Sequence, residues 1–492
     1  MQNEGNRPYK IIRVFIIIIW MLLMGVLVQR TYFNAAESYS NANRAGQQLR
    51  PREEWMGIYW GNDKVGYAVS KIKKAFKGYE IHEQGIMDLT VMGTPQRIDT
   101  QITSQVDNAF MLKSFEFRMF SNLFSFQAKG TIKGKKLHMD LLSGGSVKKS
   151  VIPLKEIPCL ASSIKPMMLA DGLMVGKKLR YHVFDPSTMS TTPVEVLVEG
   201  IEEVTLRDKH IDCYRIKSTF KGIELRSWID EDGSTIKEES PLGLMMLKES
   251  KTDALTENWG ETTKDLIAAS AIPVKRPIMI ADPSYLKVRI KNINLDEFNL
   301  SSHRQKRSEN VLEITREQLS VGTSYTIPFT PQGDMKPYLT PTAFLQSTDK
   351  TLIEKAQEIV GSERDALEAV IRIKEWVYRT IEKKPTLSIP SALDVLRVKV
   401  GDCNEHSTLF VALCRAVGIP SRLCAGIVYN QGSFYYHAWA DVFVGRWVSV
   451  DPTMDQLPVD ATHICFVEGG LDKQLEIIKL IGVVTLEVME YR

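Results

Sequence analysis

Three residues in the C-terminal part of the sequence have side chains that could together carry out acyl transfer through a thiol. The first, Cys403, opens a segment whose apolar residues recur at helical spacing, and Gly418 and Pro420 end that segment. We therefore expect Cys403 at a helix N-terminus. Free backbone N–H groups and the positive end of the helix dipole favour a thiolate there, so we expect the pKa of the thiol to fall below its usual value of about 8.5.

The second and third residues, His437 and Asp451, lie on two alternating segments that are typical of a β-hairpin. A thiol nucleophile needs a base that takes its proton and returns it to the leaving group. It also needs a carboxylate that holds this base in one tautomer. A histidine and an aspartate on neighbouring strands supply both groups at a fixed separation. The sequence therefore predicts a triad of Cys403, His437 and Asp451.

The turn of this hairpin decides whether the two side chains face each other. Side chains alternate between the faces of a strand, so a two-residue loop would put His437 and Asp451 on opposite faces. A three-residue loop with Phe443 opposite Trp447 makes them diagonal neighbours on one face. We therefore predict a three-residue turn or a bulge near Gly445. Failing that, the carboxylate would be one of two other aspartates of this region, Asp441 and Asp455.

Four short motifs enclose these residues in a fixed order. They are GDC ahead of the helix, GIPSR at its end, HAW on the first strand and DPT after the second strand. Over roughly residues 340–470 this pattern closely resembles the transglutaminase-like superfamily, whose core is related to papain-like cysteine proteases. The resemblance implies that Cys403 is the nucleophile, His437 the general base and acid, and Asp451 the orienting carboxylate.

For the reaction, the resemblance implies attack by Cys403 on a carboxamide or peptide carbonyl. A thioester acyl-enzyme would form and pass its acyl group to an amine or to water. Members of the superfamily include protein cross-linkers, peptide hydrolases, amidases and inactive relatives. We expect a protein or peptide substrate and no cofactor. Since the sequence contains no EF-hand loop, calcium activation is not indicated.

Two other classes of function compete with a thiol enzyme. One is a metal enzyme, with ligands drawn from Cys403, His406, His437 or His463, although the sequence has no HExxH motif or clustered ligand spacing. The other is a binding or assembly protein with a transglutaminase-like fold and an inactive triad. Activity that survives chelators but not thiol alkylation would exclude the first, and labelling of Cys403 by a mild thiol reagent would argue against the second.

The N-terminal segment predicts a membrane anchor over residues 11–30. Residues 14–28 carry no charge and, with the two isoleucines before them, approach the roughly 17–25 residues that a spanning helix needs. Basic residues precede the apolar run, so residues 1–10 would be cytoplasmic and the bulk extracytoplasmic, which is the periplasm in a Gram-negative bacterium. A cleaved signal peptide is the competing interpretation, but the small-x-small pattern of a cleavage site is missing.

The chain of 492 residues exceeds what one hydrophobic core can hold, so we expect several domains. Residues 31–50 form a polar tether, and alternating segments predict an antiparallel β-rich domain over 51–260. Residues 261–340 are expected to be a connector with β elements, and 341–492 a transglutaminase-like catalytic domain. The predicted fold class is α+β, with an N-terminal transmembrane helix ahead of these domains.

Composition and charge exclude some classes of partner. The formal net charge is +3, from 62 basic and 59 acidic residues, so no general electrostatic attraction to nucleic acid is expected. The basic stretch 303–307 is interpreted as a solvated loop. The six cysteines contain no CxxC pair, which argues against a zinc ribbon or a thioredoxin-like motif. The sequence leaves the oligomeric state open.

Overall fold

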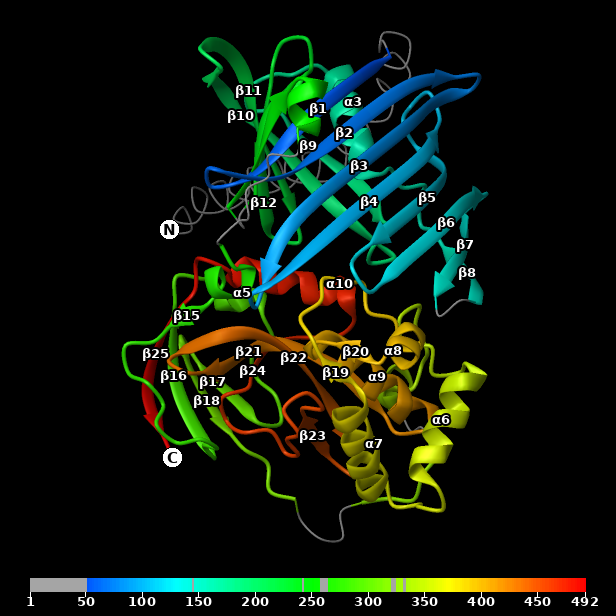
Figure 1. Ribbon diagram of the computed structural model, residues 1–492, viewed down its shortest axis with the longest axis vertical. Helices are drawn as coiled ribbons and strands as arrows, with labels where there is room; N and C mark the ends of the chain where they lie inside the picture. The colour runs from blue at the N-terminus through cyan, green and yellow to red at the C-terminus, as the bar shows by residue number, and fades with distance from the viewer. Residues whose placement is uncertain (1–50, 144–145, 241–242, 257–263, 320–323, 331–332) are drawn as a thin grey trace, which may run out of the picture.

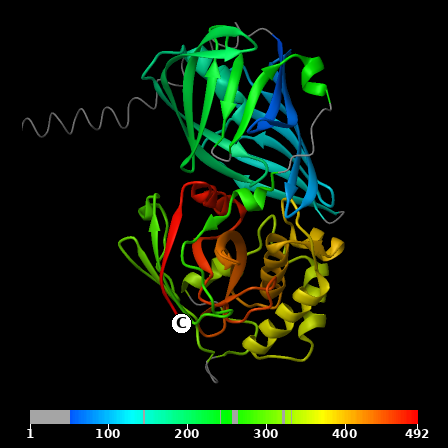
Figure 2. The same ribbon diagram turned by 60° about the vertical axis from the view of Figure 1, so that its left-hand side comes forward.

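A computed structural model describes residues 51–143, 146–240, 243–256, 264–319, 324–330 and 333–492. The chain forms two bodies, a β-sheet domain drawn above a mixed domain in Figure 1, and the same stacking is visible in the rotated view of Figure 2. The predicted anchor at 11–30 and tether at 31–50 lie outside the described residues.

The predicted membrane topology is corrected here. Within the part of the chain that the structure describes, no helix combines the length and the apolar character required to cross a bilayer. This finding contradicts the prediction of a single-pass membrane protein.

The upper domain is one antiparallel sheet, in which fourteen strands are described, in the order β8-β7-β6-β5-β4-β3-β2-β1-β14-β13-β12-β11-β10-β9. Successive strands pair throughout β1–β8 and throughout β9–β14, because short turns link them, and the pairing of β1 with β14 joins the two runs. β8 and β9 stand at the two ends of the order. The strands are β1 (Arg52–Trp60), β2 (Asp63–Ala75), β3 (Gly78–Val91), β4 (Thr94–Val106), β5 (Leu112–Phe120), β6 (Ser125–Lys133), β7 (Lys136–Ser143), β8 (Ser146–Pro153), β9 (Lys178–Asp185), β10 (Ser190–Leu206), β11 (Lys209–Phe220), β12 (Ile223–Ile229), β13 (Thr235–Glu239) and β14 (Leu244–Glu249).

The sheet curls so that its two ends approach each other. A bridge joins Cys159, which follows β8, to Val183 on β9, and the rings of Phe115 and Phe184 lie 5.4 Å apart. Helix α3 (Ala161–Asp171) packs into the curled sheet through Met167 and other buried side chains. A short helix, α4 (Lys251–Leu255), follows the last strand.

The lower domain packs helices against an antiparallel sheet of order β15-β22-β21-β24, with β23 paired to β22. An apolar face made by α7 and α9 supplies much of its core, because their apolar residues recur every three or four positions. The elements are α6 (Lys350–Val360), α7 (Ala366–Thr380), α8 (Ala392–Val398), α9 (Cys403–Ala416), β15 (Ile272–Pro273), β21 (Ser421–Asn430), β22 (Ser433–Phe443), β23 (Trp447–Val450) and β24 (Ile464–Glu468), with the small parallel pair β19 (Glu382–Lys383) and β20 (Val400–Gly401).

A four-stranded sheet flanks this domain in the order β17-β18-β16-β25. Three strands come from the predicted connector and the fourth comes from near the far end of the sequence, and together they lie at one side of the lower domain in Figure 1. The strands are β16 (Tyr285–Lys291), β17 (Gln305–Ser308), β18 (Val311–Thr315) and β25 (Thr485–Tyr491). The remaining helical turns are α5 (Leu266–Ala269), η2 (Leu295–Glu297), η3 (Gly333–Tyr338), α10 (Leu471–Gln474) and η4 (Leu475–Leu480).

The predicted α+β class is wrong for the structure as described. Strands make up more of the described chain than helices do, and one antiparallel sheet dominates the molecule. The transmembrane helix of that prediction has no counterpart among the described residues. The prediction overestimates the share of helix because the helical periodicity of the C-terminal region is the most conspicuous pattern in the sequence. The strand pattern is weaker, because it is divided among many separate segments.

The two bodies share an apolar interface. Ile389, from the segment that precedes α8, is buried in the same cluster as Leu137 of the sheet domain. The rings of Phe126 and Phe344 lie 5.9 Å apart, and Gln96 donates from Nε2 to the carbonyl oxygen of Pro385 at 3.2 Å. The sheet domain therefore packs directly against the chain that leads into the catalytic region.

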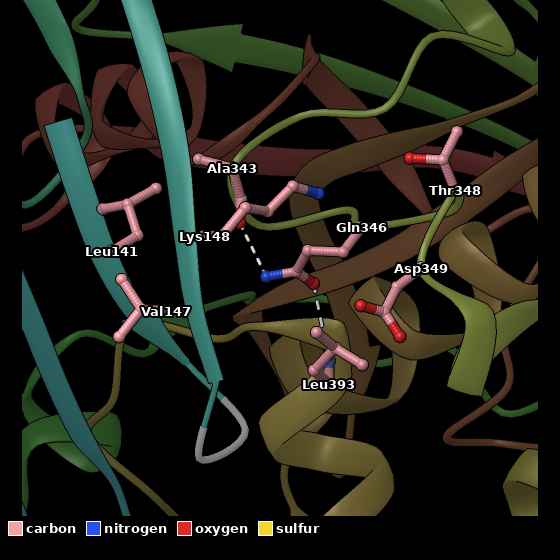
Figure 3. A pocket seen from close by; sticks show the side chains of 8 residues that line it. All are labelled: Leu141, Val147, Lys148, Ala343, Gln346, Thr348, Asp349 and Leu393. Carbon is pink, nitrogen blue, oxygen red and sulfur yellow. Dashed lines mark hydrogen bonds between the residues drawn. The ribbon is translucent and has the colours of Figure 1, made fainter. Parts of the chain in front are cut away.

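A pocket of about 270 Å³ lies at the edge of this interface (Figure 3). Leu141, Val147 and Lys148 line it from the sheet domain, facing Gln346 and other residues of the lower domain. The Gln346 amide is engaged, since its Nε2 donates to Ala343 O at 2.6 Å. None of the predicted triad residues lines this pocket.

Candidate active site

Helix α9 places Cys403 at its first position. Asp402 is the N-cap, and its side chain accepts a hydrogen bond from Asn404 N at 2.9 Å. The Glu405 carboxylate accepts in turn from Asp402 N at 2.9 Å, which completes a capping box. The predicted helix N-terminus at Cys403 is thus confirmed. Cys403 as a whole residue is partly exposed.

Two hydrogen bonds fix the start of α9 against the strand that carries His437. Tyr436 donates from its hydroxyl to Asn404 Oδ1 at 3.1 Å, and Ser407 donates from Oγ to Ala438 O at 3.1 Å. Both helix residues follow Cys403 within the first turns of α9, and their partners lie on either side of His437 in β22. The start of α9 is therefore packed against the part of β22 that carries His437.

The hairpin formed by β22 and β23 has the predicted register. Phe443 pairs with Trp447, and Val444 N donates to Arg446 O at 2.9 Å across a three-residue loop. Gly445 has φ +87°, a conformation that glycine adopts without steric cost. The predicted three-residue turn is confirmed.

His437 and Asp451 consequently meet on one face of the hairpin. His437 Nε2 lies 2.6 Å from Asp451 Oδ2, and both residues are buried. Because Nε2 is taken by the carboxylate, Nδ1 is the ring nitrogen left for the thiol. The two other candidate carboxylates are engaged elsewhere: Asp441 binds Arg422, and Asp455 pairs with Lys374 at 2.6 Å.

The Asp451 carboxylate is fully occupied as an acceptor. Its Oδ1 accepts from the backbone N–H groups of Thr453 at 2.7 Å and Met454 at 3.0 Å. Burial alone would raise its pKa. The charge and hydrogen bond of His437, with a second bond from His463, instead hold the pKa of Asp451 well below its usual value. Asp451 is therefore an anion that fixes the orientation of His437.

His463 is the residue of this site whose position sequence reasoning missed. Its Nε2 lies 3.2 Å from Asp451 Oδ2, and its Nδ1 lies 3.3 Å from Asp460 Oδ1. The sequence analysis named His463 only as a conceivable metal ligand. It precedes β24 in an irregular segment, where neither periodicity nor a motif indicates which way a side chain points. The one feature of the sequence that could have indicated this contact is the spacing of His463 three residues after Asp460.

The electrostatics of Cys403 differ from the prediction. Burial raises the pKa of the Cys403 thiol, and the negative charges of Asp402, Glu405 and Asp451 raise it further, while the backbone of Ala438 lowers it. The expected fall in pKa at the helix N-terminus is therefore wrong, because burial of the thiol, and after it the nearby carboxylates, raise the pKa. A thiol with a raised pKa needs a base to take its proton during attack.

The possible metal ligands named from the sequence are not brought together as a set. Among the described residues, one group of histidine, cysteine and acidic side chains has donor atoms within 4.8 Å of one another: His437, Asp451 and His463. All three are already joined by hydrogen bonds. His406 Nδ1 faces the carbonyl oxygen of Asp402 at 2.7 Å instead, and Cys403 is not in the group. The arrangement is that of the Asp451 carboxylate hydrogen-bonded to two histidines.

The basic stretch 303–307 is not the solvated loop that was predicted. Arg304 is buried and donates from Nη2 to the carbonyl oxygens of Val459 at 3.3 Å and Asp460 at 2.5 Å. Gln305, also buried, exchanges two hydrogen bonds with the backbone of Cys465, at 3.0 Å and 2.6 Å. These side chains hold the segment that carries Asp460 and His463.

Comparison with known proteins covers parts of the chain. A protein of Mycobacterium leprae, named ML0607 and uncharacterized, is 25% identical over 127 residues, which is 24% of this chain and 45% of that protein. An uncharacterized protein of Haemophilus influenzae is 29% identical over 152 residues, 26% of this chain and 41% of that protein. The chain thus spans less than half the length of the curated relatives it matches.

Among solved structures, a proposed cysteine protease from Cytophaga hutchinsonii is 20% identical. It covers 43% of this chain and 86% of its own, with a TM-score of 0.28. Residues 353–452, which include Cys403, His437 and Asp451, match the model of a family described as the transglutaminase-like superfamily. The chain therefore contains a domain, residues 353–452, that belongs to the transglutaminase-like superfamily.

Proposed function

We propose that this protein is a thiol acyltransferase or hydrolase in which Cys403 attacks a carboxamide or peptide carbonyl. The observation that carries the proposal is the pairing of His437 Nε2 with Asp451 Oδ2 at 2.6 Å on a strand tied to the start of α9. Since Asp451 takes Nε2, Nδ1 is the nitrogen of His437 that would receive the proton of Cys403, a residue that is partly exposed. Nucleophile, base and orienting carboxylate are the parts that such a reaction requires.

In the first step, Sγ of Cys403 forms a bond to the carbonyl carbon while its proton passes to His437. Burial and the nearby carboxylates raise the pKa of the thiol, so this proton is present at rest and the transfer accompanies the attack. The imidazolium that forms is stabilised by the Asp451 carboxylate. The developing oxyanion would lie at the N-terminus of α9, where the backbone N–H of Cys403, which the capping box does not use, can donate to it.

In the second step, the C–N bond of the tetrahedral intermediate breaks and His437 returns the proton to the departing amine or ammonia. A thioester on Cys403 remains. A second nucleophile, an amine or water, then gives its proton to His437 and attacks the thioester, and the thiol is released with that proton. Protein and peptide glutamine side chains and peptide bonds are the substrates that this chemistry suits.

The decisive experiment is capture of the acyl-enzyme. The full chain is incubated with a library of glutamine-containing peptides, quenched in acid and examined by mass spectrometry. We expect one acyl adduct, on Cys403, and none in Cys403→Ala. The matched control is Cys465→Ala, which removes another partly exposed thiol and should leave the adduct unchanged.

Two further arms separate this proposal from its competitors. Reaction with a mild alkylating reagent should abolish adduct formation, and a chelator should leave it unchanged. A binding protein with an inactive triad would show no adduct and slow alkylation of Cys403. A metal enzyme would lose its activity to the chelator.

A further inference from the structure

The structure contains a fourth buried group beside the triad that the reaction steps above do not use. His463 is 0% exposed, and both of its ring nitrogens face carboxylate oxygens: Nε2 faces Asp451 Oδ2 at 3.2 Å and Nδ1 faces Asp460 Oδ1 at 3.3 Å. An ionised carboxylate can only accept hydrogen bonds. If both aspartates are ionised, both nitrogens of His463 must carry protons.

Both aspartates are built to remain ionised. Asp451 accepts two backbone N–H bonds at Oδ1. Asp460 accepts from Thr462 N at 2.7 Å and Thr462 Oγ1 at 2.6 Å, and its other oxygen accepts from Gln456 Nε2 at 2.9 Å. Several hydrogen bonds donated to one carboxyl group favour its charged form. The pKa of Asp460 is accordingly held well below its usual value, with burial opposed by the bonds and charge of His463.

We propose that His463 is a positioning residue that remains an imidazolium between Asp451 and Asp460, holds Asp451 in place for His437 and balances the negative charge of the site. The proposal rests on the function proposed above, since the triad is what His463 serves. The buried Asp451 carboxylate, which is near enough to the thiol to raise its pKa, would otherwise disfavour the thiolate. A fixed cation between Asp451 and Asp460 offsets part of this negative charge.

The other groups around His463 fit this role. The Trp439 ring meets its ring edge to face, with centroids 5.2 Å apart and an interplanar angle of 87°. The His437 ring lies 5.7 Å away in a similar arrangement. The Arg304 guanidinium binds the backbone carbonyl of Asp460 from the side of the four-stranded sheet. Asp451 and Asp460 are the acidic groups that hydrogen-bond to His463, and Asp451 also lies close enough to Cys403 to raise the pKa of its thiol.

The proton count on His463 can be measured directly. Full-length protein labelled with ¹⁵N-histidine is examined by NMR between pH 6 and 9, with His463→Gln used to assign the signal. We expect both nitrogens of His463 to stay protonated over this range. A His463 ring with one bare nitrogen at pH 7 would overturn the proposal, and this result does not depend on whether the protein is an enzyme.

The effect on the thiol is measured by the rate at which Cys403 is alkylated as a function of pH. Removing the cation in His463→Gln makes a thiolate less favourable. The rate curve should therefore move by about one unit to higher pH, which is about a tenfold slower reaction at pH 8. Folding of each variant is checked by circular dichroism. A folded His463→Gln protein with the wild-type curve would refute the charge-balancing role.

A double variant separates charge balance from a purely structural role. His463→Gln with Asp460→Asn removes one positive and one negative charge and leaves two amides able to pair. We expect the rate of Cys403 alkylation at pH 8 to return to within about threefold of the wild-type rate. If His463 only filled space, the second substitution would leave the defect unchanged or deepen it. Should Cys403 not react even in the wild type, the proposed function fails, while the NMR measurement still decides the state of His463.

Discussion

At the scale of single residues, the site is organised around the four acceptor positions of Asp451. Two backbone N–H groups hold Oδ1, and two imidazoles hold Oδ2. A carboxylate bound in this way has no freedom to rotate, so His437 is kept in a single orientation and tautomer. Rigid supporting contacts of this kind are what a catalytic base needs.

Substitution of this carboxylate should affect catalysis far more than folding. Asp451→Asn keeps the shape but presents a donor to one of the imidazoles, so His437 loses the orientation that leaves Nδ1 free for the thiol. We expect kcat/KM for a peptide substrate to fall by about 10⁴-fold. The rate of acyl-enzyme formation measures this.

The matched control is Asp455→Asn, at the other aspartate of the same turn. Asp455 is exposed, pairs with the buried Lys374, and has φ +62°, which asparagine tolerates well. The rate of acyl-enzyme formation by Asp455→Asn should stay within about threefold of the wild-type rate. Equal losses of this rate in the two variants would show that the conformation of the turn, and not the carboxylate of Asp451, controls activity.

Some residues of the site can be predicted from the sequence and others cannot. The difference is whether a pattern in the neighbouring residues indicates the position of the side chain. Cys403 follows from the helical spacing of the segment it opens, and His437 and Asp451 follow from the alternation of one hairpin, so each can be predicted from its neighbours in the sequence. His463 is only 12 residues from Asp451, but it lies in an irregular segment where no pattern indicates the direction of its side chain. Arg304 acts through contacts between segments far apart in the chain. A basic stretch on its own gives no sign that one of its arginines is buried, because the backbone carbonyls that receive it lie more than a hundred residues away.

At the scale of elements, the strands on either side of the site are packed without spare room. Gly426 on β21 lies between His437 on β22 and Cys465 on β24. A Cβ atom at this position would stand 1.9 Å from the carbonyl oxygen of Ile464. The close approach of β24 to β21 brings His463 to Asp451. This approach depends on the absence of a side chain at Gly426.

Gly426→Ala should therefore push β24 away and weaken both folding and catalysis. We expect the free energy of unfolding to fall by about 1–3 kcal/mol, as for other overpacked sites, and acyl-enzyme formation to fall at least tenfold. Chemical denaturation and the acyl-enzyme assay measure the two effects.

The comparison variant is Gly432→Ala, in the turn of the same hairpin of β21 and β22. Gly432 has φ +93° and open space around its Cα, so alanine there costs about 1 kcal/mol through the backbone alone. Its activity should be unchanged. A loss of stability without loss of activity in Gly426→Ala would mean that β24 does not position His463.

Element types were predictable where periodicity is strong, and pairings were predictable only over short distances. The alternating segments of residues 51–260 indicated strands, and the structure has them. The four-stranded sheet joins β16 to β25. No local pattern could reveal this partner, because the two strands are separated by nearly the whole catalytic region.

At the scale of the whole molecule, the sheet domain carries charge in its interior. Glu83 on β3 lies near Glu238 on β13 and Lys165 on α3. Burial, with the nearby Glu238, raises the pKa of Glu83 to about 7. In the unfolded chain the same group has a pKa of about 4.3. Since the folded form holds this proton more tightly, stability is lost as pH rises from about 4.3 through 7.

Glu83→Gln should remove the loss of folding stability that accompanies the rise in pH. The variant should match wild type near pH 4 and be more stable by about 1–3 kcal/mol at pH 8. Denaturation by urea at several pH values measures the difference. Glu80→Gln, on the same strand and bonded to Gln105, is the control. A constant difference across this pH range would exclude Glu83 as the titrating group.

The pairing of β16 with β25 has a consequence for the order in which a newly made chain can fold. β16 leaves the ribosome long before its partner, so the four-stranded sheet stays open along one edge until Thr485–Tyr491 has been translated. Arg304 and Gln305 belong to this sheet and its margin, and they hold the segment that carries His463. The nucleophile is therefore synthesised well before the support of its histidines can be completed. A chain stalled before Thr485–Tyr491 would carry the thiol without that support, and the surroundings of the site would be complete only after this strand has been made.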